Sequence, residues 1–283
     1  MAVIRAMQRS EVERLLGWAA EESWNPGRND AALFWELDPQ GFLAIEVEDE
    51  LAGGGAIIWH NPSFGFMGLF LMRPEFRGLH LGTELWYARR DRLIQRLEPG
   101  GTIGLDAVDQ MIPFYARGGF EPYYRHRRFE WQPVAADEAD AGIVDLRTVE
   151  WDDIATFDSR CFPGDRKAFL QSWYRQPGAV SLAVMVDGAI QGFGIMRPCI
   201  VGWKIGPLFA NGPEIARRLL CAFASSAGEG PIYLDVPDQN QDAIPLCQQW
   251  GMKEVFGCVR MYFGREPAID HDKIFATTTL EVG

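Results

Sequence analysis

The sequence predicts an α+β, or mixed α/β, fold that occurs twice along the chain. Three observations support this prediction. The chain has 283 residues, which is more than one compact core of ordinary size holds and enough for two domains. Its two halves repeat a set of spaced residues. In the first half, helix-like and strand-like patterns also follow one another around a strand-turn-helix corner.

The internal repeat sets the domain boundaries. "IGLDAVDQ" from Ile103 matches "IYLDVPDQ" from Ile232, and "IPFYARGGF" from Ile112 matches "IPLCQQWGM" from Ile244 in its Ile-Pro and Gly-apolar pairs. The offset grows from 129 residues (232 minus 103) to 132 (244 minus 112), which is a three-residue loop insertion. Between the halves, "PVAADEADAG" is small, acidic and without apolar periodicity. We therefore expect domains at 1–132 and 143–283 and a linker at 133–142.

The elements of the first half begin with a helix and three strands. "SEVERLLGWAA" has apolar residues at helical spacing and a capping-box pattern of Ser10 with Glu13. "GFLAIEVEDELAGGGAIIWH" indicates two strands joined by an acidic turn near Glu48, and "FGFMGLFLM" indicates a third strand.

The corner "MRPEFRGLHLGTELW" joins this third strand to the next helix. Leu81, Leu85, Trp86, Leu93 and Leu97 fall within about half of a helix circumference. A strand "TIGLDAV", a short helix "MIPFYARGG" and a strand "YYRHRRFEW" follow. In the second half, the apolar strand "WKIGPLFA" precedes a helix that begins in "NGPEIARRLL".

Composition excludes several classes of function. A formal net charge of -12 repels a phosphate backbone, so we expect no nucleic-acid partner unless one face concentrates the basic residues. The candidate for such a face is the basic stretch "YYRHRRFEW", whose alternating arginines and aromatics favour a half-exposed strand instead. No window approaches the roughly 20 apolar residues of a membrane span, so we expect no membrane partner. Charges also interrupt the N-terminal stretch before it resembles a signal segment.

The cysteines and histidines give no framework for disulfides or metals. The five cysteines all lie in the second half at spacings that fit neither a disulfide set nor a metal knuckle, so we expect a cytoplasmic protein. The four histidines form no ligand pair at helical spacing, and we expect no metal site.

The corner is suited to an anion. A strand that ends at a glycine-containing loop and leads into a helix gathers unpaired backbone N–H groups at the positive end of the helix dipole. Such a place binds phosphates. The spacing fits neither a P-loop, because no Gly-Lys-Ser/Thr follows, nor the dinucleotide motif GxGxxG.

The corner does resemble the coenzyme-binding motif of the GNAT acyl-CoA N-acyltransferases, a strand followed by Arg/Gln-x-x-Gly-x-Gly/Ala and a helix. "IPFYARGGF" is similar to a later signature of that family, and the second half resembles the degenerate C-terminal domain of its tandem members. The resemblance implies two GNAT-like domains, each a mostly antiparallel twisted sheet flanked by helices. It assigns acetyl-CoA contacts to Phe70, Leu71, Met72, Arg77, Gly78, Leu79, His80, Leu81, Gly82 and Thr83.

The sequence departs from the family pattern at His80, where glycine is usual. Its N–H group is still available, and histidine is among the residues that tolerate positive φ. A plain tight corner is the alternative interpretation. "NGPEIARRLL" in the second half offers no equivalent array, so we expect one coenzyme per chain.

Acyl transfer to an amine needs a proton for the departing thiolate. The resemblance places Tyr115 as the general acid, and a core tyrosine is the alternative. Cys247 stands at the aligned position of the second half, so the fold alone does not require the tyrosine. Asp106 is the candidate base, although its repetition as Asp235 favours a structural role. Glu46 and Glu75 are no better candidates.

Trp24 and Asn25 lie in a region that borders the acceptor pocket in this family, where an aromatic face and an amide suit an amine. A plug over the core is the alternative. The leading hypothesis is an acetyl-CoA-dependent N-acetyltransferase of a small-molecule amine, in a chain that could form a homodimer. Another acyl group or a protein amine is a second hypothesis. A non-catalytic acyl-CoA-binding regulatory module is a third.

Overall fold

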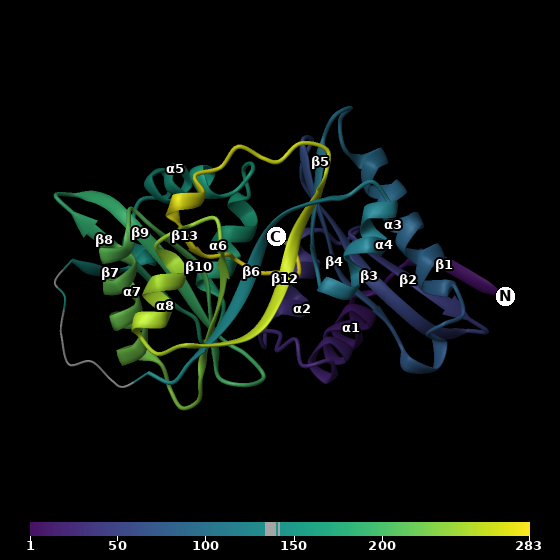
Figure 1. Ribbon diagram of the computed structural model, residues 1–283, viewed down its shortest axis with the longest axis horizontal. Helices are drawn as coiled ribbons and strands as arrows, with labels where there is room; N and C mark the ends of the chain where they lie inside the picture. The colour runs from purple at the N-terminus through teal and green to yellow at the C-terminus, as the bar shows by residue number, and fades with distance from the viewer. Residues whose placement is uncertain (134–139, 141) are drawn as a thin grey trace. The chain divides into compact units, whose positions relative to one another are not determined.

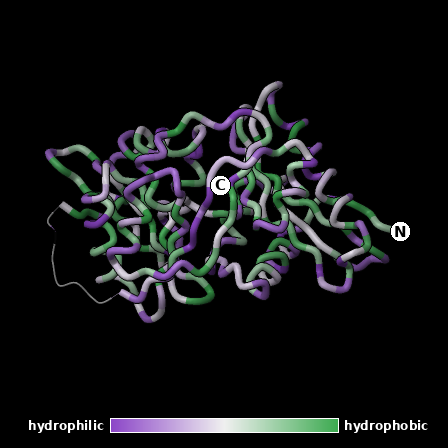
Figure 2. Tube along the Cα trace, in the orientation of Figure 1, coloured by the Kyte–Doolittle hydropathy of each residue, from purple (hydrophilic) through white to green (hydrophobic). Residues whose placement is uncertain are grey.

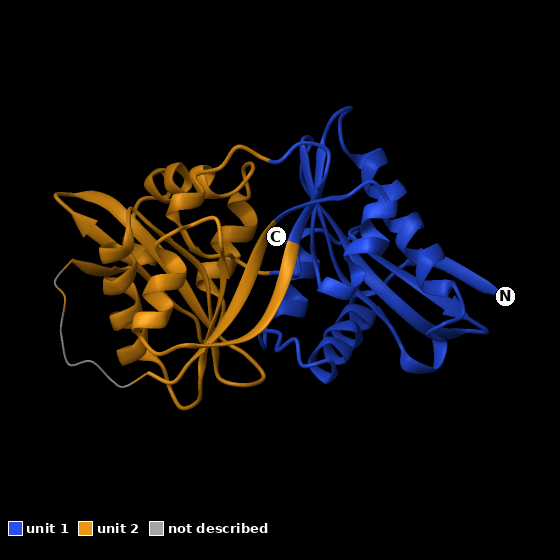
Figure 3. Cartoon of the chain, viewed as in Figure 1, with its two compact units in different colours: residues 1–123, 260–266, 280–283 blue, residues 124–259, 267–279 orange. Residues whose placement is uncertain are grey.

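A computed structural model describes residues 1–133, 140 and 142–283. These residues form two compact units, shown in blue and orange in Figure 3. The first unit consists of Met1–Tyr123, Arg260–Glu266 and Leu280–Gly283. The second consists of Tyr124–Val259 and Pro267–Thr279. Most of the expected linker at 133–142 lies outside the described residues.

The two units differ from a simple division of the chain at that linker. Strand β6 (Glu121–Trp131) belongs to the second unit from Tyr124 onward, although it precedes the linker. Strand β12 (Lys253–Phe263) contributes its last four residues, 260–263, to the first unit. Each unit is therefore completed by segments from the other half of the sequence.

The first unit contains a largely antiparallel sheet in the order β1-β2-β3-β4-β5-β12 (Figure 1). Adjacent strands from β1 to β4 are antiparallel, whereas β4 and β5 are parallel. Its strands are β1 (Ala2–Ala6), β2 (Phe42–Val47), β3 (Glu50–Asn61), β4 (Phe64–Met72) and β5 (Thr102–Ala107). Its helices are α1 (Arg9–Glu21), α2 (Asp30–Leu37), α3 (Leu81–Arg96) and α4 (Ile112–Arg117).

The second unit repeats this arrangement in the order β12-β6-β11-β10-β9-β8-β7, with β13 beside β10. Its only parallel pair among the described strand registers is β10 with β11. Its further strands are β7 (Ile143–Asp145), β8 (Val180–Val186), β9 (Ala189–Pro198), β10 (Trp203–Ala210), β11 (Ile232–Pro237) and β13 (Ile274–Ala276). Its helices are α5 (Trp151–Cys161), α6 (Lys167–Arg175), α7 (Pro213–Ser226) and α8 (Ala243–Gln249).

The expected elements are present, with differences at the N-terminus. The predicted strand "FGFMGLFLM" coincides with β4, and the basic stretch "YYRHRRFEW" lies in β6. The capping box of α1 is formed by Gln8 and Glu11, whose carboxylate accepts the Gln8 N–H at 2.7 Å. Ser10 already lies inside the helix, so the predicted pairing with Glu13 is wrong. Strand β1 was not predicted.

Strand β4 separates from β5 at a bulge. Its pairing with β5 runs from Phe64 to Met67, and the register with β3 shifts between Gly54 and Ala56. Leu69 takes a φ of 49° at this point. The extra residue bends the strand, so the last residues of β4 continue beyond the edge of β5 toward the corner.

Hydrophobic and hydrophilic stretches alternate over short distances along both units (Figure 2). Among the described residues, no helix is long and apolar enough to cross a membrane. The core of the second unit packs α7 and α8 on the sheet, with Leu219, Phe223 and Leu246 among its buried side chains.

Candidate active site

The corner after β4 exposes a row of backbone donors. Residues Pro74–Phe76 form one turn of 3-10 helix, Gly78 and His80 take φ values of 79° and 63°, and α3 begins at Leu81. His80 thus adopts the left-handed conformation expected to be tolerable there. No hydrogen bond within the described part of the chain uses the N–H groups of residues 78–82. These five donors lie at the positive end of a 16-residue helix.

Side chains close the corner onto the rest of the first unit. Arg77 donates from Nε to the carbonyl of Met72 at 2.9 Å and forms an ion pair with Glu22. A Cβ placed on Gly82 would lie 3.2 Å from Met72 Cγ and 3.6 Å from Phe70 Cζ. The helix therefore begins directly against the end of β4, where a side chain at position 82 has little room. Leu79 is 59% exposed, so the loop itself faces solvent.

Tyr115 lies on α4 inside an aromatic cluster. Its ring centroid is 5.7 Å from that of Trp86 and 5.5 Å from that of Phe114, and the residue is 9% exposed. Burial raises the pKa of Tyr115 to about 12, although the positive charge of Arg89 acts in the opposite direction. Its hydroxyl makes no hydrogen bond to any described residue. The phenol is therefore protonated at neutral pH and its proton is available to a ligand.

Arg89 is a polar residue of this region that the sequence prediction missed. It is 1% exposed and points from α3 toward the bulge of β4, where it donates to the carbonyls of Ala56 at 2.5 Å and Gly68 at 2.6 Å. The available signal was its position, because it follows Leu85 and precedes Leu93 by four residues on the apolar face of the helix.

Asp106, the candidate base, is held in an ion pair. Arg260 donates to both of its carboxylate oxygens at 2.9 and 2.8 Å, and the two side chains are 3% and 7% exposed. The second unit repeats the pair between Asp235 and Arg128 at 2.6 and 2.8 Å. The repetition in a unit without the coenzyme motif favours a structural role. The assignment of Asp106 as base stays a prediction.

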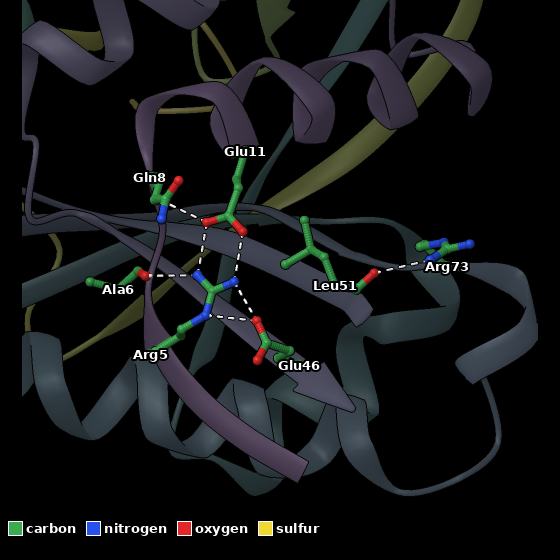
Figure 4. A network of polar contacts seen from close by, with 7 residues as sticks. All are labelled: Arg5, Ala6, Gln8, Glu11, Glu46, Leu51 and Arg73. Atoms are coloured by element: carbon green, nitrogen blue, oxygen red, sulfur yellow. Dashed lines mark hydrogen bonds and ion pairs between the residues drawn. The ribbon is translucent and has the colours of Figure 1, made fainter. Parts of the chain in front are cut away.

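The two glutamates that were weighed as bases also have cationic partners. Glu46 accepts from Arg5 at 2.9 and 2.5 Å, and the same guanidinium binds Glu11 (Figure 4). Hydrogen bonds from Arg5 lower the pKa of Glu11. Glu75 pairs with Arg73 beside the corner. The Arg5 contacts join β1, α1 and β2, and these ion pairs give neither Glu46 nor Glu75 an advantage as a base.

Trp24 and Asn25 lie in the loop between α1 and α2 of the first unit. Both are half-buried. The backbone N–H of Trp24 donates to the Ala19 carbonyl at 2.9 Å, and Asn25 takes a φ of 52°. This left-handed turn fixes the loop conformation. Their contact with an acceptor stays a prediction.

The strand registers identify the matching position in the second unit. Ile103 and Ile232 are repeated residues, and they pair with Gly65 of β4 and Trp203 of β10 respectively. Residues of β10 therefore correspond to residues of β4 with an offset of 138 (203 minus 65).

This offset shows that the chain itself fills the equivalent slot of the second unit. Phe70 and Leu71, which the family resemblance pairs with the coenzyme arm, correspond to Leu208 and Phe209. Those two residues pair with Ala276 and Ile274 of β13. The backbone edge that is expected to receive a ligand in the first unit is thus occupied by a strand in the second.

Two GNAT profiles match the sequence. One, described as an acetyltransferase (GNAT) family, matches residues 9–120, and the other, described as an acetyltransferase (GNAT) domain, matches residues 154–276. The chain belongs to the GNAT family of acyl-CoA N-acyltransferases. Because both halves match, it is a tandem GNAT protein.

Curated relatives and solved structures align with most of the chain. Holothin acyltransferase from Pseudoalteromonas sp. (strain SANK 73390) is 26% identical over 94% of this chain and 89% of its own. The uncharacterized N-acetyltransferase YitH from Bacillus subtilis is 22% identical over 77% and 76%. A Pyrococcus horikoshii structure described as an acetyltransferase covers all of this chain and 96% of its own, with a TM-score of 0.85 and 23% identity. A tandem GNAT protein from the clavulanic acid biosynthesis pathway covers 94% and 99%, with a TM-score of 0.67 and 12% identity. These structural likenesses support the fold.

Proposed function

We propose that the protein transfers an acetyl group from acetyl-CoA to the amine of a small molecule, and that the first unit alone binds the coenzyme. The observation that carries this proposal is the row of N–H groups at residues 78–82, which have no hydrogen-bond partner in the described part of the chain. Such donors at a helix N-terminus suit a pyrophosphate. The occupied edge of β10 supports a single site.

The chemistry follows from the groups around the corner. A neutral amine attacks the thioester carbonyl, and the carbon–sulfur bond then breaks with its electron pair on sulfur. Tyr115 donates its proton to that sulfur. Binding both reactants in one place supplies most of the remaining acceleration by proximity. Arg260 donates to both carboxylate oxygens of Asp106, which supports a structural role for Asp106 and leaves its assignment as the base a prediction.

The acceptor and the compartment rest on weaker support. Trp24 and Asn25 offer an aromatic face and an amide for an amine, and the net charge of -12 suits a cationic substrate. The name of the holothin acyltransferase supports acyl transfer as the reaction class. The five cysteines, all within the described residues, form no disulfide, and a cytoplasmic location is part of the proposal.

Calorimetry with acetyl-CoA, followed by a screen of small amines for acetyl-CoA-dependent thiol release, tests the proposal. We expect one coenzyme site per chain and at least one amine that releases thiol at a rate dependent on Tyr115. Two equivalent coenzyme sites would contradict the assignment to the first unit. Coenzyme binding without any acetylated amine would favour the regulatory alternative.

A further inference from the structure

Arg89 has the features of a buried group that is retained for a reason other than packing. Burial lowers the pKa of its guanidinium to about 10, since no carboxylate among the described residues pairs with it. Its two hydrogen bonds go to backbone carbonyls, and its Nε has no partner. A buried cation of this kind is costly for folding.

The sheet makes room for this guanidinium. A Cβ on Gly55 would collide with Arg89 Cζ, so the glycine leaves the space that the cation fills. Gly55 alone stands opposite Leu69 and Phe70, the two residues of the β4 bulge. The cation therefore lies where β4 leaves β5, at the beginning of the segment expected to hold the coenzyme arm.

The second unit provides an internal comparison for this position. Ile57 of β3 pairs with Met67 of β4, which corresponds to Ile205 of β10, and Ile205 pairs with Met196 of β9. Residues of β9 therefore correspond to residues of β3 with an offset of 139 (196 minus 57), and the pairs beyond the bulge give the same offset. Gly55 thus corresponds to Gly194. A Cβ on Gly194 would lie 2.9 Å from Phe223 Cε2.

Phe223 of α7 thus occupies in the second unit the place that Arg89 occupies in the first. Phe223 is fully buried and belongs to the hydrophobic core. An apolar side chain at this helix position is therefore compatible with the fold. The arginine occurs only in the unit that carries the coenzyme corner. Tyr115 shows the same difference, because its counterpart is Cys247.

Arg89 lies on the same helix face as a residue that contacts Tyr115. Trp86, one turn earlier on α3, packs its ring on the Tyr115 ring, and residues three apart on a helix share a face. Within the described part of the chain, Arg89 is the charged group that acts on the pKa of Tyr115.

We propose that Arg89 is a positioning residue for the acyl transfer that we assign to the first unit, and that its charge stabilises the phenolate of Tyr115. When the carbon–sulfur bond breaks, the sulfur keeps the electron pair and takes the phenolic proton. Tyr115 is left as a phenolate beside the guanidinium. It regains a proton from the protonated nitrogen of the attacking amine, so no proton is gained or lost over the cycle.

The first test measures how the charge of Arg89 affects the pKa of a tyrosine at position 115, and it needs no acceptor amine. A fluorinated tyrosine incorporated at position 115 titrates at lower pH than tyrosine and is observed by fluorine NMR in the folded protein. Arg89→Met should raise its pKa by about one unit or more, because the stabilising charge is lost. Arg89→Lys should restore most of the difference. Arg96→Met is the control for loss of a cation from the same helix, since Arg96 also donates to a β3 carbonyl, that of Ile57 at 3.2 Å, although unlike Arg89 it pairs with a carboxylate, that of Asp38 at 2.8 Å.

An unchanged pKa in folded Arg89→Met would overturn the proposal, whatever reaction the protein catalyses. Should that variant not fold, Arg89→Gln keeps amide donors for the two carbonyls, removes the charge and carries the same expectation. This outcome is separate from failure of the proposed function, which would appear as an absence of any acetylated amine.

The second test is a double-mutant cycle on an amine that the parent acetylates. Arg89→Met should lower kcat at least tenfold, with the dissociation constant of acetyl-CoA changed less than threefold. In a Tyr115→Phe background the same substitution should have little further effect on kcat, because the group it acts through is absent. An equal loss of kcat in both backgrounds would show that Arg89 acts independently of Tyr115 and would overturn the proposal.

Discussion

Replacement of Tyr115 by phenylalanine tests whether Tyr115 acts as the general acid or only packs in the core. The ring packing on Trp86 is retained, and only the hydroxyl is removed. If that hydroxyl protonates the thiolate, kcat should fall by about 10²-fold, or roughly 2.7 kcal/mol of transition-state free energy. The dissociation constant of acetyl-CoA should stay nearly constant, as for an interaction made mainly in the transition state.

The structure also fixes the expected effect on stability. The Tyr115 hydroxyl has no hydrogen bond to a described residue, so its removal leaves no partner unsatisfied, and Tm at pH 7 should change by no more than about 2 °C. Burial raises the pKa of Tyr115 from 10.0 to about 12. Between these two pH values the tyrosine ionises in the unfolded chain but not in the folded one, so the folded protein keeps its full stability below pH 10 and loses stability as pH rises toward 12. The shift corresponds to about 3 kcal/mol. Tyr115→Phe should therefore be the more stable protein at pH 11.

Stopped-time thiol assays, calorimetry and thermal melts measure these three quantities. Tyr87→Phe is the matched control, because Tyr87 contacts the same Trp86 ring at 4.9 Å. It should keep the parental kcat. Parental turnover by Tyr115→Phe on a verified acceptor would refute the acid and leave Tyr115 as a core residue.

Two further substitutions test the corner and the candidate base. Gly82→Glu adds bulk 3.2 Å from Met72 and a negative charge at the helix N-terminus, so acetyl-CoA affinity measured by calorimetry should fall at least tenfold, about 1.4 kcal/mol. Gly17→Glu adds the same side chain to α1, where a Cβ meets nothing within 4 Å, and should leave affinity unchanged. Asp106→Asn breaks a buried ion pair and should lower the free energy of unfolding by about 3–5 kcal/mol, as Asp235→Asn should in the second unit. Retention of kcat by the folded fraction of Asp106→Asn would confirm the structural role, whereas a selective loss of kcat at unchanged stability would restore Asp106 as the base.

Local patterns in the sequence account for the elements and for the corner. Strand β4 was predicted with its observed bounds because its apolar run ends at a proline and glycine loop, and the internal repeat revealed two copies of one fold. The corner was recognised because glycines, an arginine and a helix start occur at fixed spacing. Short-range chemistry of this kind is visible in a single sequence.

Long-range partners were not visible in this way. Asp106 and Arg260 are 154 residues apart, and no local period links them. The exchange of β6 and β12 between units depends on the pairing of distant strands. Arg89 was missed because the contacts of a charged residue on an apolar helix face depend on the bulge in β4, which the sequence does not reveal.

The exchange of segments also bears on how the protein is made. Chains are synthesised from the N-terminus, and N-terminal domains usually fold first during translation. Here the first unit includes Arg260–Glu266 and Leu280–Gly283, so it cannot be completed until those residues have left the ribosome. A product terminated before residue 260 would carry the whole corner of Arg77 and Gly82 but would leave the Asp106 carboxylate without Arg260. The unit whose first residues are translated first thus depends for its completion on residues that are translated much later.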